Sequence, residues 1–230
     1  MRRFFAMATV FAVTLAAGCG WLKDDIEDLT TVDISAEIPA EFPVDASEAC
    51  STAIEGIDSC DQGGTAPAPM RIELDPIEFD LNVDVVEATG KSRLGDAVDR
   101  LESVTITSID WEVRDNSLSF NLPETSLYVG VFDAESRNHE SAFSVAKIPS
   151  VPAGTNDSGT SQVSDDDQAE LSDLLIGDDK ETDEKLKLSV IPYTVPYIEQ
   201  GQDVPPNGSA TIDVTINAEF VATPKSVVSN

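Results

Sequence analysis

The stretch Val32–Asp45 reads VDISAEIPAEFPVD, and its apolar residues fall on every second position. The even positions from Val32 to Val44 are all apolar, whereas the odd positions are acidic, serine or proline. This period of two predicts a β-strand with one buried face and one solvent-exposed face. Pro39 and Pro43 have no backbone N–H to donate, so we expect the second half of the strand to lie at a sheet edge or to leave the sheet.

The same alternation recurs along the chain and indicates the fold class. Its clearest second instance is Ile77–Val85, in which Phe79 and Leu81 should face the core while Glu78 and Asp80 face solvent. Further strands are expected over residues 104–113, 118–122, 127–132, 142–148, 186–190 and 211–221, with a β-bulge at 107–108 and interruptions at Pro192 and Pro196. Strands joined by turns, without alternating βαβ units, predict a mainly β protein: an antiparallel β-sandwich of about eight or nine strands.

Two or three short helices should lie at the periphery of this sandwich. Asp45 and Glu48 form a capping-box pattern ahead of a short helix near residues 49–56. Apolar residues at helical spacing predict an amphipathic helix over residues 92–102. Ser164 is a suitable N-cap for a helix that ends at Gly177. The polar stretches 149–164 and 178–184 are expected to be loops.

The first eighteen residues have the organisation of an export signal. Arg2 and Arg3 precede the uncharged, mostly apolar run Phe4–Ala17. As a helix this run would span about 21 Å at ~1.5 Å per residue, which is short of the ~30 Å hydrocarbon core. It therefore indicates a signal peptide and not a transmembrane helix.

Small residues then lead directly into a cysteine in LAAGCG, residues 15–20. This arrangement resembles the lipobox of bacterial lipoproteins, although Ala16 stands where leucine is usual, three positions before the cysteine. The resemblance implies that residues 1–18 are removed and that Cys19 becomes an acylated N-terminus carrying palmitate-type chains. The absence of aspartate at Gly20 favours the outer membrane. An incidental cysteine in a secreted protein is the alternative.

The expected domains follow from these signals. They are the signal peptide over 1–18, a membrane-proximal tether over 19–30, the β-sandwich over 31–224 and a C-terminal tail over 225–230. The localisation expected is the cell envelope, as an outer-membrane lipoprotein facing the periplasm or the surface.

Composition restricts the partners of the chain. Asp and Glu number 43 against 14 Lys and Arg, a formal charge of −29, and removal of Arg2 and Arg3 makes the mature chain more negative. Such a surface repels nucleic acid and anionic lipid head groups, and neither is therefore an expected partner. It would attract cations or a basic partner, or serve solubility alone. The membrane is reached through the N-terminal lipid, and the protein partner is unknown.

The other two cysteines, Cys50 and Cys60, form an even pair in an exported chain and are expected to form a disulfide. Free thiols or a metal site are the alternatives. A metal site with two cysteines would need histidines, and the chain has only His139.

Signals for catalysis are weak. Ser144 and Lys147 match S-x-x-K, but its companion motifs are absent and Ser144 lies in a strand-like run. His139 stands in a polar loop. The acidic stretches 164–167 and 178–184 lack the glycine and terminal glutamate of an EF-hand, so weak surface Ca²⁺ binding is the most that they indicate. No catalytic residue, metal ligand or cofactor is predicted.

The function expected is a lipid-anchored envelope protein with a non-enzymatic binding or structural role. An envelope hydrolase that uses acidic residues is one alternative. A lipid carrier with an apolar cavity between the sheets is the other.

Overall fold

The computed structural model describes residues 32–46, 64–65, 72–177, 180–182, 184–199, 201–204 and 206–223. Its main strands are β1 (Val32–Asp45), β4 (Ile77–Glu78), β5 (Leu81–Asp84), β6 (Leu101–Arg114), β7 (Thr125–Gly130), β8 (Phe143–Ile148), β9 (Asp157–Ser161), β10 (Lys187–Thr194) and β13 (Ser209–Ala222). Four two-residue strands form two small ribbons: β2 (Gly64–Thr65) with β12 (Asp203–Val204), and β3 (Ile72–Glu73) with β11 (Tyr197–Ile198). The helices are α2 (Val85–Thr89), α3 (Ser92–Ala97) and α4 (Asp165–Ile176), with a 3-10 turn at Val98–Arg100.

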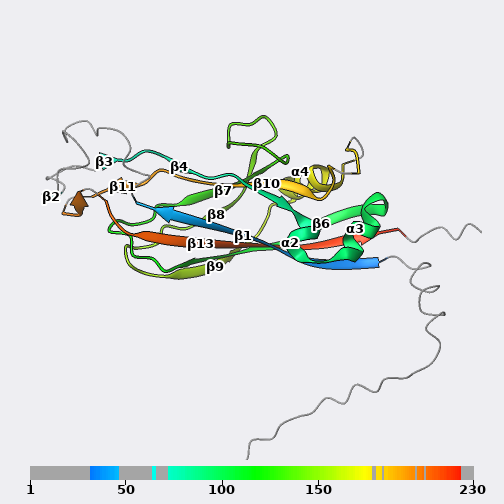
Figure 1. Cartoon of the computed structure of the whole chain (residues 1–230), viewed down its shortest axis with the longest axis horizontal. Coiled ribbons are helices and arrows are strands. Elements are labelled where there is room, and N and C mark those ends of the chain that lie inside the picture. The colour runs from blue at the N-terminus through cyan, green and yellow to red at the C-terminus, as the bar shows by residue number, and fades with distance from the viewer. Residues whose placement is uncertain are drawn as a thin grey trace, which may run out of the picture.

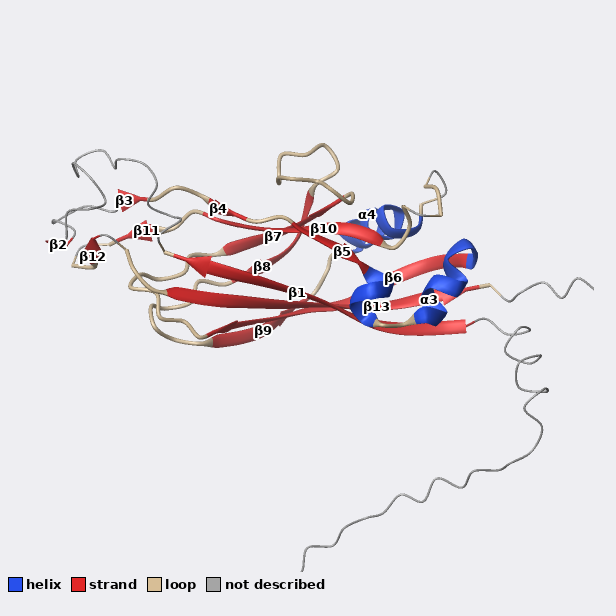
Figure 2. Ribbon diagram, in the orientation of Figure 1, coloured by secondary structure: helices blue, strands red, loops and turns tan. Residues whose placement is uncertain are grey.

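The main strands form two antiparallel sheets packed face to face (Figures 1 and 2). One sheet has the order β1-β13-β6-β9, and the other has β4 and β5 together, then β10, β7 and β8. When β4 and β5 count as one strand, the first strand pairs with the eighth, the second with the seventh, the third with the sixth and the fourth with the fifth. This folded-back pairing is that of a double-sheet jelly roll. The predicted mainly β antiparallel sandwich is confirmed.

One continuous core lies between the sheets. Both contribute side chains that are almost completely buried, among them Phe42 and Phe220 from the first sheet and Leu127 and Val190 from the second. On β1 every even residue from Ile34 to Val44 is buried and every odd residue is exposed. The predicted period of two therefore holds along the described side chains of this strand.

Strand β1 lies at the edge of its sheet, as its prolines predicted. The Ala46 N–H donates to the Gly208 carbonyl on the β13 side, at 3.0 Å. The Ser35 carbonyl accepts instead from Nζ of Lys91. Amide groups of successive strand residues point to opposite sides, so the odd residues face the open edge, including Pro39 and Pro43. The missing N–H groups therefore fall where another chain would otherwise pair.

The predicted strand Ile77–Val85 is divided, and Pro192 explains why. Its two pieces, β4 and β5, pair with β10 in one continuous register. The carbonyl of Pro192 accepts from the Phe79 N–H at 3.4 Å, so the amide of Pro192 faces the same segment without a hydrogen to offer. The predicted interruption of β10 at Pro192 is wrong, because β10 continues to Thr194. The missing N–H of Pro192 instead interrupts the neighbouring strand, between β4 and β5. Phe79 and Leu81 are half-buried instead of deeply buried.

The predicted bulge in β6 is confirmed at Thr107, which has no partner on β13 between Ile106 and Ser108. Beyond the bulge, β9 pairs only with residues 109–113 of β6. The side chain of Gln168 on α4 takes the place of a strand beside Ile106: its Oε1 accepts from the Ile106 N–H at 2.8 Å, and its Nε2 donates to the Ile106 carbonyl. This amide closes an otherwise open stretch of sheet edge.

Several boundaries differ from the sequence prediction. The helix expected over 92–102 stops earlier, because Leu101 already pairs with Ala222 of β13. Val85 begins α2, since the Asp84 carboxylate accepts from the N–H groups of Val86 and Glu87 and caps a helix there. The helix capped by Ser164 and ended by Gly177 is confirmed as α4.

Two assignments between β6 and α4 were wrong. Residues 118–122 are not a strand: Leu118, Phe120 and Leu122 are buried, but only Leu122 makes a β-bridge, to Val151. The expected loop 149–164 contains β9. Its sequence DSGTS lacks an apolar alternation because Gly159 leaves room for a neighbouring ring. A Cβ built there would lie 2.6 Å from the indole of Trp111.

The helix expected near 49–56 lies outside the described residues.

Candidate functional site

The three cysteines singled out by the sequence, Cys19, Cys50 and Cys60, lie outside the described residues. Lipid attachment and the disulfide therefore remain predictions. Within the part of the chain that the structure describes, no helix is long and apolar enough to cross a membrane.

The residues of the weak catalytic motifs take separate places. Ser144 is an exposed residue of β8 and does not open a helix, and Lys147 pairs with Glu124 at 2.6 Å. The hydrogen bond to Glu124 raises the pKa of Lys147. His139 is exposed, and its Nδ1 lies 2.8 Å from Oγ of Ser141. That hydroxyl also accepts from the Val131 N–H at 3.0 Å, so the contact closes the loop between β7 and β8.

The outer face of the four-stranded sheet carries a row of three carboxylates. Glu41 on β1 stands opposite Asp213 on β13, which stands opposite Glu112 on β6. Like charges directly opposite one another destabilise a sheet. We call these three residues the carboxylate row.

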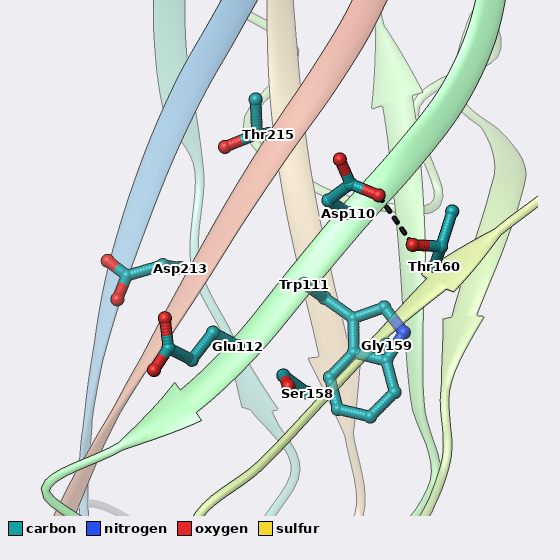
Figure 3. A pocket seen from close by; sticks show the side chains of 8 residues that line it. All are labelled: Asp110, Trp111, Glu112, Ser158, Gly159, Thr160, Asp213 and Thr215. Atoms are coloured by element: carbon teal, nitrogen blue, oxygen red, sulfur yellow. Dashed lines mark hydrogen bonds between the residues drawn. The ribbon is translucent and has the colours of Figure 1, made fainter. Parts of the chain in front are cut away.

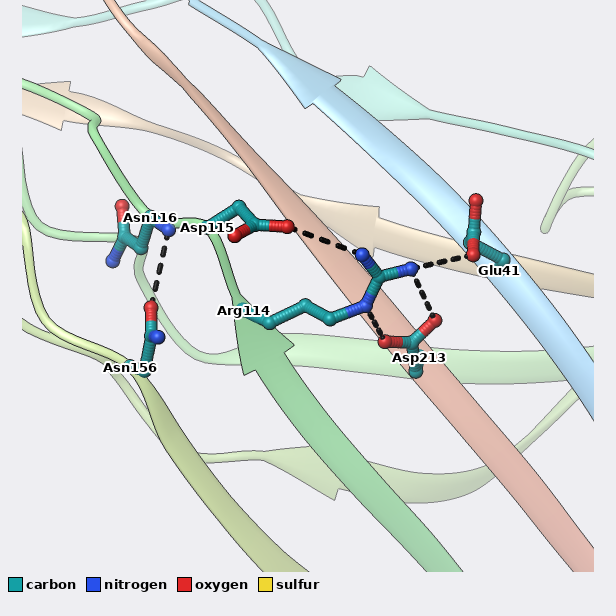
Figure 4. Close-up of polar contacts among 6 residues, drawn as sticks. All are labelled: Glu41, Arg114, Asp115, Asn116, Asn156 and Asp213. Atoms are coloured by element: carbon teal, nitrogen blue, oxygen red, sulfur yellow. Dashed lines mark hydrogen bonds and ion pairs between the residues drawn. The ribbon is translucent and has the colours of Figure 1, made fainter.

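Arg114 offsets this repulsion (Figure 4). Its Nη2 donates to Oε2 of Glu41 at 2.6 Å and to Oδ1 of Asp213 at 3.3 Å, its Nε donates to Asp213, and its Nη1 donates to Oδ2 of Asp115 at 3.1 Å. The hydrogen bond to Asp213 raises the pKa of the guanidinium further above its usual range, and the charges of Asp213 and Glu41 add to that shift. The planar guanidinium thus joins β1, β13 and the turn after β6.

The same close-up shows how that turn is held (Figure 4). Asp115 has a positive φ of 52°, and the Asn116 N–H donates to Oδ1 of Asn156 at 3.1 Å. The buried Asn116 amide donates to the carbonyls of Pro152 and Thr155 and accepts from the Leu118 N–H. The turn is therefore fixed to the 151–156 loop, which positions Arg114 at the end of β6.

The sequence analysis did not single out Arg114. The sequence signal that could have identified it is its isolation, because it is the only basic residue between Arg100 and Arg137, in a strongly acidic stretch.

A shallow hollow of about 340 Å³ adjoins the carboxylate row (Figure 3). It is lined by Asp110, Trp111 and Glu112 of β6, Ser158, Gly159 and Thr160 of β9, and Asp213 and Thr215 of β13. Asp110 is already engaged: it accepts from the Thr160 hydroxyl at 2.6 Å and from Nδ2 of Asn217 at 2.7 Å. The hollow is open to solvent, and its lining combines carboxylates and hydroxyls with the ring of Trp111.

The acidic stretches considered for Ca²⁺ have a structural role where they are described. Ser164 caps α4 by accepting from the Asp167 N–H at 3.2 Å, and Asp165, Asp166 and Asp167 occupy the first helical turn. Carboxylates there interact favourably with the helix dipole. Over the described residues, no group of three or more His, Cys, Asp or Glu side chains is arranged to hold a metal ion.

A loop over residues 131–142 covers part of the outer face of the second sheet. Asn82 on β5 and Asp133 exchange two hydrogen bonds of 2.9 Å. The Arg137 guanidinium stacks 3.7 Å above the ring centre of Tyr193 on β10. Ile191, an outward-facing residue of β10, is completely buried. The sequence did not predict this cover, because loop contacts leave no periodic signal.

Comparisons with known proteins give structural matches only. No family model and no curated protein matches the chain. Similar solved structures include a decameric BFDV capsid protein, at 9% identity and a TM-score of 0.36, covering 83% of this chain and 99% of that chain. A T=3 Penaeus vannamei nodavirus matches at 10% identity and a TM-score of 0.34, covering 98% of this chain and 61% of that chain. A Macrobrachium rosenbergii nodavirus particle matches at 10% identity and a TM-score of 0.32, covering 84% and 95%. At these scores the matches carry no argument about function.

Proposed function

We propose that the protein is a lipid-anchored module of the cell envelope, attached through acylated Cys19, with a binding or structural role and no catalytic one. The observation that carries the proposal is that the parts of a lipoprotein signal occur in the right order at the start of the sequence. A basic pair at Arg2 and Arg3, the short apolar run Phe4–Ala17 and small residues before Cys19 follow one another in the order of a lipoprotein signal. Gly20 favours the outer membrane as the destination.

Acylation of this kind supplies a stable anchor. Each buried CH₂ contributes about 0.8 kcal/mol, and one acyl chain alone binds reversibly. Lipoproteins of the resembled class carry two or three chains, which is enough for lasting attachment.

The architecture is compatible with action through the surface of the sandwich. Large side chains from both sheets, such as Phe42, Phe220 and Leu127, meet in one core. This packing favours a surface role over carriage of a lipid between the sheets. The hydrolase alternative would use carboxylates, and in the clearest cluster, the carboxylate row, both Glu41 and Asp213 are already paired with Arg114.

The experiment is fractionation of cells that express Cys19→Ser. The variant should leave the membrane fraction or accumulate with its signal peptide uncut, because the acyl acceptor is gone. The double variant Cys50→Ala with Cys60→Ala is the matched control, since it also loses thiols and should remain in the membrane fraction. Mature-sized Cys19→Ser protein that still sediments with membranes would contradict the proposal.

A further inference from the structure

Asn207 and Gly208 form an Asn-Gly pair in the turn before β13, and we propose that Asn207 is a site of spontaneous deamidation in the folded protein. Isoaspartate, one product of this reaction with water, then opens the contact between the turn and residues 117–119. The inference does not depend on lipid attachment at Cys19, because it rests on described residues of the sandwich alone.

The reaction needs only the chain and water. The Gly208 nitrogen attacks Cγ of Asn207 and closes a five-membered succinimide ring. The Cγ–Nδ2 bond breaks, and Nδ2 leaves as ammonia with the proton of the Gly208 N–H. Water then opens the ring at either carbonyl. Opening at the side-chain carbonyl gives aspartate, whereas opening at the main-chain carbonyl gives isoaspartate, in which the main chain runs through the former side-chain carbons.

The Gly208 N–H is free to act as the nucleophile. The carbonyls on both sides of it are engaged: that of Asn207 accepts from the Ser119 N–H at 2.9 Å, and that of Gly208 accepts from the Ala46 N–H at 3.0 Å. The Gly208 N–H itself makes no hydrogen bond to any described residue. Since glycine has no Cβ, no side chain at position 208 hinders the approach of this nitrogen to the Asn207 amide.

The side chain of Asn207 is exposed, and its amide makes no hydrogen bond to a described residue. This separates it from most of the seven asparagines that the structure describes. Five of them have a hydrogen-bonded side-chain amide: Asn82, Asn116, Asn121, Asn156 and Asn217. The amide of Asn138 is also free, but the N–H of His139, which would be its nucleophile, donates to the Ser136 carbonyl at 3.0 Å. Within the described chain, only Asn207 has both a free side-chain amide and a free N–H after it.

The turn is joined to residues 117–119 by hydrogen bonds that we call the clasp. The Ser119 N–H donates to the Asn207 carbonyl and the Asn207 N–H donates to Oγ of Ser119, both at 2.9 Å. The Ser117 N–H donates to the Ser209 carbonyl at 2.7 Å, and the Ser209 N–H donates to Oγ of Ser117 at 3.0 Å. Gly208 lies between these pairs without spare room, because a Cβ there would be 2.0 Å from the Ser117 carbonyl oxygen.

Isoaspartate at position 207 does not fit the clasp. It adds a methylene to the main chain before the Gly208 nitrogen, and it moves the carbonyl that accepts from Ser119 off the main chain, into a free carboxylate. The hydrogen bonds on the two sides of Gly208 then no longer share one spacing, and the tight approach to Ser117 leaves no room for adjustment. Aspartate at position 207 leaves the main chain unchanged, so it should keep the clasp.

Peptide mass spectrometry of the mature protein, kept folded in mildly alkaline buffer, tests the site. The peptide that contains Asn207 should gain the mass that corresponds to exchange of an NH₂ for an OH group, and fragmentation should show isoaspartate as well as aspartate. Peptides that contain Asn138 or Asn156 should stay unchanged. The variant Asn207→Gln should also stay unchanged, because its ring closure would need a six-membered ring. An Asn207 that stays intact in the folded protein, whether or not it reacts in urea, would overturn the site, as would equal reaction at Asn138.

Backbone hydrogen exchange tests the effect on the clasp. Amides of residues 117–120 and 209–211 should exchange several-fold faster in the isoaspartate form than in fresh protein, because they open locally. Amides of residues 127–129, on β7 in the other sheet, should not change. Freshly prepared Asn207→Asp is the matched control, since it adds the same charge without lengthening the main chain, and it should exchange like the parent protein. Unchanged exchange in the isoaspartate form, or equally fast exchange in Asn207→Asp, would overturn the effect on the clasp.

Discussion

Replacement of Phe220 by alanine tests the sandwich itself. Phe220 lies on the central strand β13, between Ile34 of β1 and Val104 of β6, and is 0% exposed. Truncating a fully buried phenylalanine costs about 3–5 kcal/mol, from lost burial and from the cavity left behind. With a urea m-value of about 2–3 kcal/mol per M for a domain of this size, the unfolding midpoint should fall by about 1–2.5 M.

The matched control is Glu219→Ala, one residue earlier on the same strand. Glu219 is exposed on the outer face, so its loss should change stability by less than about 0.5 kcal/mol. Urea unfolding of both variants, followed by tryptophan fluorescence and by circular dichroism, gives the comparison. Similar midpoints for the two variants would show that the buried face of β13 has been assigned incorrectly, and with it the packing of one sheet on the other.

The remaining predictions concern single contacts. In thermal melts, Gly208→Ala should destabilise the protein more than Gly154→Ala does. Both glycines have a positive φ, which costs about 1–3 kcal/mol for other residues. Only at residue 208 would the new Cβ also meet backbone, at 2.0 Å from the Ser117 carbonyl oxygen. Equal effects would show that the close approach is unimportant. Gln168→Met should cost about 1–3 kcal/mol for each backbone group of Ile106 left unpaired and buried, measured as a shift in urea midpoint, and an unchanged midpoint would contradict the role of this amide at the sheet edge. Arg114→Gln should lower stability more at low salt than at high salt, since it exposes the repulsion that the guanidinium offsets, and a salt-independent loss would argue against that role.

The fold class could be predicted from the sequence because burial on one face of a strand leaves a direct trace. In the structure the even residues of Val32–Asp45 whose side chains are described are buried, and the predicted β-bulge is found at Thr107. The α4 helix was predicted for a similar reason, since Ser164 is a local start signal and Gly177 a local stop signal.

The features that were missed depend on contacts between distant residues. Strand β9 has no apolar alternation, because its inner face is Gly159 beneath the Trp111 ring. The division of Ile77–Val85 arises from Pro192, more than a hundred residues away. Arg114 binds carboxylates on three segments, and neither Glu41 nor Asp213 carries any local sign of that partner. The predicted anchor and disulfide cysteines lie outside the described residues and await experiment.

Mass spectrometry of the N-terminal peptide tests the central claim most directly. Mature protein isolated from its native envelope should begin at Cys19, lack residues 1–18, and carry a mass increase that corresponds to two or three acyl chains. Release of fatty acid by mild base should remove the ester-linked part of that increase. An unmodified Cys19, or a mature N-terminus at any other residue, would contradict the lipid-anchored account.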